Sequence, residues 1–433
     1  MRFAIVGAGA GGLAAAYDLA GAGNSVSIFE AETEVGGLAG GFRVPGWEWS
    51  LERFYHHWFA SDRAILSFIQ ELGWQRDVIF RRPVTAVYFR GKFYPMDSIP
   101  AWLTFPGLSI PNRLRNLAVG GFLRLTPFWR PLEAFTAESW MRRYFGKEVF
   151  ESLWKPLFVG KFGEEAYRDV NMAWFWARLH SRTARLGTFR GGFQEFLDRL
   201  AKEVESLGAT LQLRTPVSRI TAEVNGRLSL RLPDRTELYD ACLVTLSPSL
   251  LAKMAPGLPA DYLAKLLPQQ SMGAVVLILA LSHQLAESGI YWHSLVKGEG
   301  FPFLALVEHT NYLPKEYFGG NHILYCGDYL ATEHEYFQLS HDQLLERFLP
   351  ALSRFNPNFR PDWVKDSWLF RTPYAQPIPV LNHSENLPGI RTPMHGLYFA
   401  SMSQVYPWDR GTNYAVDLAR KAARMMQRDM RQG

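Results

Sequence analysis

The sequence contains little cysteine. Its two cysteines, Cys242 and Cys326, lie in separate apolar runs of the kind found in buried strands. A disulfide framework needs more cysteines at suitable spacings, and a structural zinc site usually takes four cysteine or histidine ligands. We therefore expect two buried thiols, a reducing compartment and a cytoplasmic location, and no metal site built on cysteine.

An excess of charge of one sign is also missing. Lys and Arg number 46 against 41 Asp and Glu, so the formal net charge is only +5, spread without long basic runs. Nucleic-acid binding therefore has little support. The best apolar run, 274–281, is far shorter than the about 20 residues that span a bilayer. The small apolar residues after Arg2 are better explained by the glycine spacing described below than by a signal peptide.

Aromatic residues, by contrast, are plentiful. They make up 14% of the chain and include 14 Trp. That share suits a large apolar pocket, and it suits a large core equally well. With 433 residues the chain can form two domains. Composition therefore permits a two-domain enzyme with an apolar pocket. The class of enzyme has to be inferred from the sequence motifs.

The first 30 residues contain the strongest motif. An apolar run, 3–6, leads into Gly7, Gly9 and Gly12 in the spacing GxGxxG, and an Ala-rich helical pattern and a second strand-like run ending at Glu30 follow. Gly7 permits a tight turn, Gly9 lets the backbone approach a pyrophosphate, and Gly12 lets the helix pack on the strand. The helix N-terminus favours phosphate, and the Glu30 carboxylate can bind ribose hydroxyls. The sequence therefore predicts a dinucleotide-binding βαβ unit.

A second glycine-rich segment, 34–41 (EVGGLAGG), follows that acidic residue closely. It resembles the second FAD-contacting loop of the flavin amine oxidase superfamily, which includes protoporphyrinogen oxidases, carotenoid desaturases and UDP-galactopyranose mutases. The resemblance implies FAD as the cofactor, contacted by Gly36, Gly37 and Leu38. Many members carry a basic residue where this chain has Leu38, so we expect Arg53 to supply the charge contact to the pyrophosphate.

The C-terminal segment resembles the last flavin motif of the same superfamily. Residues 396–400 form a strand-like run and 411–426 a helical one, whose N-terminus the resemblance places at the flavin's pyrimidine edge. Most oxidases have Gly-Asp after the strand, whereas this chain has Ser-Met, and we expect the run 409–413 to supply the missing polar contacts. The residues expected to contact the flavin here are Ser401, Met402, Gly411, Thr412 and Asn413.

The resemblance implies further site residues in the body of the chain. Val217 matches the position that pairs its backbone with adenine, which tolerates almost any side chain. His56 and His57 lie in an aromatic segment that returns toward the flavin ring in the family, so either one faces the ring or both are hydrogen-bonded loop residues. Adjacent side chains diverge, so we expect no metal there. Tyr374 is expected to approach the ring from the second domain, and the catalytic candidates are these two histidines and Tyr374.

The whole pattern predicts an α/β protein of two discontinuous domains. Residues 1–80, 186–250 and 390–433 are expected to form a Rossmann-type FAD-binding domain. Residues 81–185 and 251–389 are expected to form an α+β substrate or lid domain, with an antiparallel sheet plus helices.

Periodicity places several elements inside these domains. A hairpin is expected where Arg90-Gly91 separates two alternating runs, 85–89 and 92–94. A helix is expected over 194–207, after an aromatic–Gly–Gly turn at 189–193. The strands expected for the antiparallel sheet are 275–281, 304–307, 323–329 and 364–370.

Residues 99–160 combine Pro-punctuated helices with aromatic residues and arginines. Such a mixture occurs in helices that lie on a membrane surface. It also occurs in helical lids whose arginines cover apolar surface. Both interpretations stay open, and a weak membrane-surface contact is one expected partner besides a small-molecule substrate. The residues concerned are Trp102, Phe105, Phe122, Phe128, Trp129, Arg113, Arg115, Arg124 and Arg130.

Two enzyme functions fit these motifs. An FAD-dependent oxidoreductase would take a hydride at flavin N5 from a largely apolar organic substrate, which requires a dry cavity that aligns the C–H bond. A non-redox isomerase of a nucleotide sugar, like the mutases, would need several arginines for the diphosphate. A flavin-binding scaffold without turnover is a third, weaker reading, and no oligomeric state is indicated. We favour the oxidoreductase because the Trp-rich middle of the chain suits an apolar substrate. The arginines available to the isomerase are Arg178, Arg182, Arg185 and Arg371.

Overall fold

The computed structural model describes residues 1–432 and contains two main sheets. The first is a parallel sheet of five strands in the order β10-β2-β1-β14-β20. Apolar residues fill both faces of its central strands, as expected for a parallel sheet that is covered on both sides. Its strands are β1 (Arg2–Val6), β2 (Ser25–Phe29), β10 (Thr210–Gln212), β14 (Ala241–Val244) and β20 (Leu397–Phe399).

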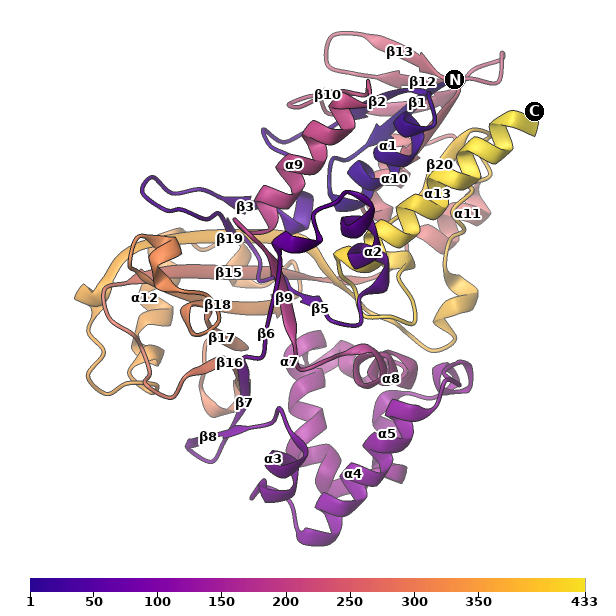
Figure 1. Cartoon of the computed structure of the whole chain (residues 1–433). Helices are drawn as coiled ribbons and strands as arrows, with labels where there is room; N and C mark the ends of the chain where they lie inside the picture. The colour runs from indigo at the N-terminus through magenta and orange to yellow at the C-terminus, as the bar shows by residue number, and fades with distance from the viewer. Residues whose placement is uncertain (433) are drawn as a thin grey trace.

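Helices cover one side of the parallel sheet (Figure 1). α1 (Ala10–Gly21) packs against α13 (Thr412–Gln432) and α9 (Phe193–Ser206), and α13 also packs against α2 (Arg63–Glu71). Their buried side chains form one core with the sheet, and the alanines of α1 let its neighbours approach closely. The expected βαβ unit and the expected C-terminal helix are both confirmed, and they lie side by side although most of the chain separates them.

The opposite side of this sheet is covered by a three-stranded antiparallel sheet and two short helices. Alternation along β1 explains the two layers, because Ala4 and Val6 point to this side while Phe3 and Ile5 point to the helices. The sequence does not predict β13, whose four residues include two polar ones. The elements are β11 (Arg219–Ala222), β12 (Leu228–Arg231), β13 (Thr236–Tyr239), α10 (Pro248–Met254) and α11 (Ala260–Leu266).

The second sheet has seven strands in the order β19-β15-β18-β17-β16-β7-β8. The predicted hairpin is confirmed, because β7 and β8 flank Arg90 and Gly91, which both have positive φ. The four predicted strands pair antiparallel, whereas β16 is additional and pairs with β7 in parallel. The helix α12 (His341–Leu352) packs against this sheet. The strands are β7 (Val84–Phe89), β8 (Lys92–Pro95), β15 (Ser271–Leu281), β16 (Ile290–Ser294), β17 (Ala305–Glu308), β18 (His322–Leu330) and β19 (Val364–Pro377).

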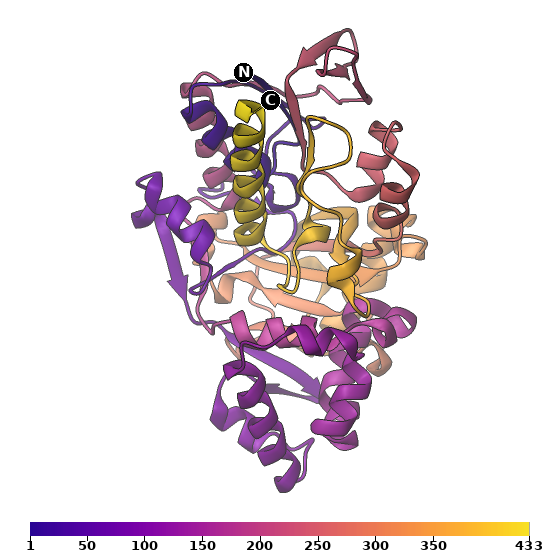
Figure 2. The same cartoon turned by 90° about the vertical axis from the view of Figure 1, so that its right-hand side faces the viewer.

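Residues 99–181 form a helical lobe that lies at the lower end of the molecule in Figures 1 and 2. The side chains of Ser98, Thr136 and Asn171 start three of its helices by accepting a hydrogen bond from the first helical turn. Its core is rich in aromatic residues, which pack edge to face, as Trp154 does on Phe175. The helices are α3 (Ile99–Thr104), α4 (Ile110–Leu125), α5 (Ala137–Tyr144), α6 (Lys147–Val149), α7 (Lys155–Ala166) and α8 (Met172–Ser181).

Short strands carry the chain between the two main sheets. β3 (Gly41–Phe42) pairs with β4 (Leu51–Glu52), and β9 (Leu186–Phe189) pairs with β5 (Trp58–Phe59) and β6 (Val78–Arg81). All strands of the parallel sheet fall inside the ranges expected for the FAD-binding domain, and all strands of the second sheet inside those expected for the substrate domain. The domain boundaries themselves stay a prediction.

The helix α13 has 21 residues and is amphipathic, with its apolar face buried on α1 and α2. None of the helices within residues 1–432 combines the length and the apolarity that crossing a membrane requires.

Candidate active site

A single cavity joins the two parts of the molecule. It has a volume of about 1890 Å³ and extends from the glycine loops of the parallel sheet to the helical lobe. Pockets for one small ligand usually measure about 300–1,000 Å³. This cavity therefore has room for a dinucleotide and a second molecule together.

The first glycine loop forms one end of this cavity. Gly7 has a φ of +106°, which favours glycine, and its N–H donates to the Phe29 carbonyl at 2.8 Å. A Cβ on Gly12 would lie 2.0 Å from the Gly7 carbonyl oxygen, so a larger residue there would separate α1 from β1. At Gly9 the nearest atom to such a Cβ would be 3.8 Å away, which leaves the backbone open toward the cavity. The predicted roles of the three glycines therefore match the geometry.

Glu30 lies at the end of β2 and lines the cavity. One of its carboxylate oxygens accepts the N–H of Ala8 at 2.7 Å, and the other accepts the N–H of Glu32 at 3.0 Å. Each oxygen has a second lone pair. The carboxylate is therefore held in place by the backbone and can still accept hydrogen bonds from the ribose hydroxyls of an adenine dinucleotide.

The second glycine loop packs directly on the first. The N–H of Gly36 donates to the Ala8 carbonyl at 2.9 Å, and Gly36 and Gly37 both have positive φ. Gly37 and Leu38 line the cavity beside Gly36. Sequence reasoning missed Gln194, which fixes this loop by accepting the N–H of Gly41 at 2.8 Å and donating to the Val35 carbonyl.

Two predicted cofactor contacts lie away from the cavity lining. The Arg53 guanidinium donates to the Glu34 carboxylate at 3.2 Å, and Arg53 is not among the residues that line the cavity within positions 1–432. Val217 is buried beside β2 and is likewise absent from the lining of the described cavity. Its backbone N–H and carbonyl have no hydrogen-bond partner in residues 1–432, which is what pairing with adenine would need. Both contacts stay predictions.

The C-terminal motif reaches the cavity as expected. Ser401 and Met402 line it, and α13 begins at Thr412, next to Gly411. Within residues 1–432 the N–H groups of Thr412 and Asn413 have no acceptor, as is usual for a first helical turn. These free donors and the positive end of the helix suit an electron-rich ring edge.

The side chains at this helix start hold other elements in place. The Thr412 hydroxyl accepts a hydrogen bond from the Trp58 indole at 2.8 Å, and the Asn413 side chain accepts the N–H of Ile65 at 3.1 Å, at the start of α2. Asn413 itself does not line the described part of the cavity. Its contribution to the cofactor is therefore limited to the backbone N–H.

Tyr374 lies on β19 and lines the cavity, and its approach to the flavin ring stays a prediction. Its hydroxyl accepts the N–H of Ser403 at 2.9 Å and shares a hydrogen bond with the Ser401 hydroxyl at 3.0 Å. Burial raises the pKa of Tyr374, although the hydrogen bonds with the two serines oppose that shift. The residue links the second sheet to the C-terminal motif and stays protonated near pH 7.

His56 and His57 both line the cavity but point to different partners. His56 Nδ1 donates to the Phe54 carbonyl at 2.6 Å, and His57 Nε2 shares a hydrogen bond with the Tyr291 hydroxyl at 2.6 Å. Burial lowers the pKa of His56 to about 4 and that of His57 to about 3. Both rings are therefore neutral near pH 7, and they diverge as expected.

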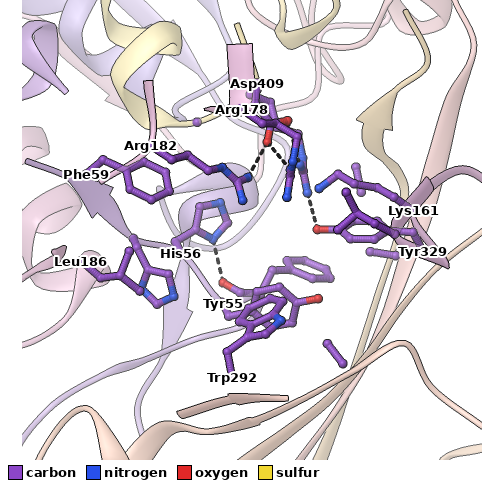
Figure 3. A pocket seen from close by; sticks show the side chains of 18 of the residues that line it. Tyr55, His56, Phe59, Lys161, Arg178, Arg182, Leu186, Trp292, Tyr329 and Asp409 are labelled. Carbon is purple, nitrogen blue, oxygen red and sulfur yellow. Dashed lines mark hydrogen bonds and ion pairs between the residues drawn. The ribbon is translucent and has the colours of Figure 1, made fainter. Parts of the chain in front are cut away.

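A charged cluster that the sequence did not bring together lies in the same cavity (Figure 3). Asp409 accepts hydrogen bonds from Arg178 at 2.8 Å and from Arg182 at 2.6 Å, and Arg410 lies 3.7 Å from its other oxygen. Burial alone would raise the pKa of Asp409, but the surrounding cations, including Lys161, hold it well below its usual range. Arg178 and Arg182 lie more than 200 residues before Asp409 in the sequence, so no local pattern predicts these two pairs. The sequence indicated the parts separately, as the polar run 409–413 and as two of the four arginines available for a diphosphate.

The parallel sheet, the two glycine loops and the helix start together define a protein that binds an adenine dinucleotide next to a second ligand. The sequence model of the family described as "Flavin containing amine oxidoreductase" matches residues 10–426. The chain belongs to this family. The predicted family resemblance and the predicted cofactor, FAD, are therefore confirmed.

Named relatives match parts of the chain. A probable zeta-carotene desaturase from Synechococcus elongatus is 28% identical over 265 residues, which cover 52% of this chain and 53% of the relative. Coproporphyrinogen III oxidase from Staphylococcus aureus is 24% identical over 279 residues, which cover 56% and 59%. The matches thus span about half the length of these relatives. A solved structure of reduced UDP-galactopyranose mutase shares the fold, with a TM-score of 0.76, 16% identity and coverage of 98% and 95%.

Proposed function

We propose that the enzyme oxidises a largely apolar organic substrate, which passes a hydride to flavin N5. The observation that carries this proposal is the cavity, which joins the glycine loops to a lobe lined mainly by apolar side chains. Such a lining binds an apolar substrate and keeps water away from the reacting C–H bond. FAD supplies the hydride acceptor, while the protein supplies binding, orientation and dry surroundings. Apolar residues at the lobe end include Tyr88, Phe89, Trp102, Phe105, Trp154 and Leu157.

The candidate catalytic residues are compatible with a hydride transfer in an apolar site. His56 and His57 add no charge to the cavity near pH 7, and Tyr374 remains a neutral phenol. The hydrogen bond of 2.6 Å between the Tyr291 hydroxyl and His57 Nε2 holds the His57 ring in place at the cavity wall. The catalytic roles of the two histidines and of Tyr374 remain proposals.

The names of the relatives also support an oxidation. One relative is described as a desaturase of zeta-carotene, and the other as an oxidase of coproporphyrinogen III. A desaturation and an oxidation are both redox reactions on an organic molecule. We propose the same class of reaction for this chain without assigning either substrate to it.

Anaerobic titration tests the proposed function. The purified protein should be yellow and should release FAD on denaturation. Oxidisable apolar compounds are then added without oxygen, and a substrate should bleach the flavin absorbance, which an electron acceptor should restore. Catalytic turnover of a nucleotide sugar by the dithionite-reduced protein, with no bleaching by any apolar compound, would overturn the proposal.

The isomerase alternative has weaker support from the geometry. Arg178 and Arg182 lie in the cavity, where one nitrogen of each donates to Asp409. Arg371 donates to the carbonyls of Tyr336 and Leu339. Arg185 and Arg371 do not line the cavity within residues 1–432. Two of the four arginines proposed for a diphosphate are therefore placed elsewhere.

We also propose that the helical lobe contacts a lipid surface. Phe122, Leu125 and Phe128 are 58%, 82% and 75% exposed, and they lie at the end of α4 and just beyond it. The same helix also lines the cavity, through residues that include Leu117 and Gly120. An apolar substrate could then pass from lipid to cavity without crossing water. Other exposed apolar residues of the lobe are Ile99, Leu103, Ile110, Leu114, Phe135 and Tyr144.

Two arginines of the lobe donate hydrogen bonds to backbone carbonyls of the lobe itself. Arg113 donates to the carbonyls of Leu103 and Leu108, and Arg115 donates to those of Arg143 and Tyr144. Lipid contact would therefore depend on the apolar side chains. Co-sedimentation with vesicles of phosphatidylcholine and phosphatidylglycerol tests it. The double substitution Phe122→Ser and Leu125→Ser should abolish binding, whereas Leu267→Ser, at another exposed leucine, should not. Equal binding by all three proteins would contradict the proposal.

A cytoplasmic location is proposed as well. Cys242 and Cys326 are free and buried, and burial raises the pKa of both thiols. Free thiols of this kind are usual in reducing compartments. Cell fractionation that placed the protein in an oxidising compartment would contradict this location.

A further inference from the structure

The charged cluster contains more positive than negative groups. Around Asp409 lie Arg178, Arg182 and Arg410, of which Arg178 and Arg410 are largely buried. One carboxylate faces three guanidinium groups, so two positive charges lack an ionic partner in the cluster. Arg410 also donates to the neutral oxygens of Gln376 and Tyr329, which carry no compensating charge. Buried charges are usually paired, because leaving them unpaired is costly.

Lys161 adds an independent observation at the same place. Its side chain is only 8% exposed and lines the cavity, and within residues 1–432 its amine has no hydrogen-bond partner. The nitrogen lies 5.0 Å from the ring centre of Tyr329 and 5.8 Å from that of Trp174. Figure 3 shows the side chain extending into the pocket from the side of Tyr329. A buried amine with free donors, directed into a cavity, is a ready partner for a ligand group.

We propose that the charged cluster binds the oxyanion group, a carboxylate or a phosphate, of an otherwise apolar substrate. This inference rests on the proposed function, since it names the polar group of that same substrate. Lys161 would donate from one side and the free edges of the arginines from the other. The charge-assisted hydrogen bonds would place the anion near the helix start at Thr412, and the apolar body would extend toward the helical lobe.

Binding of an anion is coupled to the protonation of Lys161. Burial lowers the pKa of the free amine well below its usual range, and the neighbouring arginines lower it further, while Asp409 opposes them. A bound anion raises that pKa and so favours the charged form of the amine. The affinity for the anion should therefore fall as the pH rises. The charged and titratable groups that face the amine are Arg178, Arg182, Tyr329, Asp409 and Arg410.

The experiment uses the oxidised protein with FAD bound, so the pyrophosphate of the cofactor is already in place. Dodecanoate, dodecyl phosphate and dodecanol share one apolar chain, and they are titrated while the flavin absorbance and the heat of binding are recorded. We expect one of the anions to bind at least about tenfold more tightly than dodecanol. The anion with the higher affinity shows whether carboxylate or phosphate is preferred.

Two lysine variants show whether the preference for the anion depends on Lys161. Lys161→Met should remove most of the preference for the anion and its dependence on pH. Lys155→Met should retain both, because Lys155 lies on the same helix and pairs with Glu151 outside the cavity lining. If Lys161→Met does not load FAD, the wild-type ratio between anion and alcohol, and its change with pH, still decide the question.

Equal affinities of the wild-type protein for dodecanol and for both anions would overturn the inference. So would an unchanged preference in a folded Lys161→Met protein. The proposed oxidation is judged separately by anaerobic bleaching of the flavin, and the cofactor content is measured in the same samples. A failure of the anion site is therefore distinguishable from a failure of the proposed function.

Discussion

Glu30 holds a backbone turn and faces the cavity at the same time. Its replacement by Ala removes a charged acceptor from the ribose and leaves the N–H of Ala8 without its partner. We expect the affinity for FAD to fall by about 2–3 kcal/mol, which is roughly 30- to 150-fold in the dissociation constant. Titration of the apoprotein with FAD, followed by flavin fluorescence, measures the change.

The variant Glu30→Gln serves as the control. Its amide oxygen can still accept the N–H of Ala8, so the turn should be retained while the charge is lost. We expect it to bind FAD more tightly than the Ala variant and less tightly than the wild type. An unchanged affinity in Glu30→Ala would mean that this carboxylate serves the turn alone.

Local residue patterns account for one half of the candidate site. The three glycines and Glu30 lie within 30 residues, and their roles follow from backbone geometry that a sequence pattern can specify. The charged cluster could not be found in this way, because Arg178 and Asp409 come from segments that only the folded chain brings together. Arg53 illustrates the same limit, since its pairing with Glu34 depends on how two loops meet.

At the scale of elements, α1 offers two glycines for the same substitution. Gly12→Ala would place a Cβ 2.0 Å from the Gly7 carbonyl oxygen, so the helix would have to move away from β1. We expect this variant to fail to retain FAD and to be less stable. At Gly21, on the same helix, the nearest atom to a Cβ would be 4.0 Å away.

The matched variant Gly21→Ala should therefore load FAD normally. Its stability should be unchanged or higher by up to about 1 kcal/mol, because Ala favours helix over Gly. Cofactor content and urea unfolding of both proteins provide the comparison. If both variants lost FAD equally, packing at Gly12 would not be the reason for glycine there.

The elements that periodicity predicted are those with a clear apolar pattern. The helices α1, α9 and α13 and the long strands β15 and β18 were all expected, because each has an extended apolar pattern, alternating or nearly continuous. β16 was missed because its residues, IYWHS, alternate only weakly. Its parallel pairing with β7 depends on contacts between distant parts of the chain, which a local pattern does not contain.

Two neighbouring strands of the second sheet contain a titratable pair. His293 on β16 and Glu308 on β17 are both buried, and 3.9 Å separates their nearest nitrogen and oxygen. Burial raises the pKa of Glu308 to about 8 and lowers that of His293 to about 4. Between pH 4 and pH 8 both side chains are therefore neutral, although they lie close enough to form an ion pair. Burial disfavours the charged form of each side chain by more than their mutual attraction would favour it.

A dependence of stability on pH follows from the raised pKa of Glu308. The Glu308 carboxyl has a pKa of about 8 in the folded protein and 4.5 in the unfolded chain. Its contribution to the free energy of unfolding is therefore complete below pH 4.5 and is lost as the pH rises from 4.5 toward 8. We expect the free energy of unfolding of the wild type to decrease between pH 6 and 9 relative to Glu308→Gln, which does not titrate. Urea unfolding across this range measures the difference. A difference that stays constant with pH would contradict it.

At the scale of the whole molecule, the single cavity makes the cofactor part of the wall against which a second ligand rests. A ligand that touches the cofactor binds the loaded protein more tightly than the empty one, and FAD must then bind more tightly, by the same factor, when the ligand is present. We expect dodecanoate to raise the affinity for FAD and FAD to raise the affinity for dodecanoate equally. Titrations of each ligand with and without the other measure both factors.

If the two factors equal one, the cofactor and the second ligand occupy independent spaces. If they exceed one, the enzyme has no complete substrate site until FAD is bound. Cellular supply of the cofactor would then govern how much substrate the protein retains, as well as how fast it turns over. Loss of FAD would then lower the affinity for the substrate by the same factor, so the empty protein would retain less of the compound that the loaded enzyme consumes.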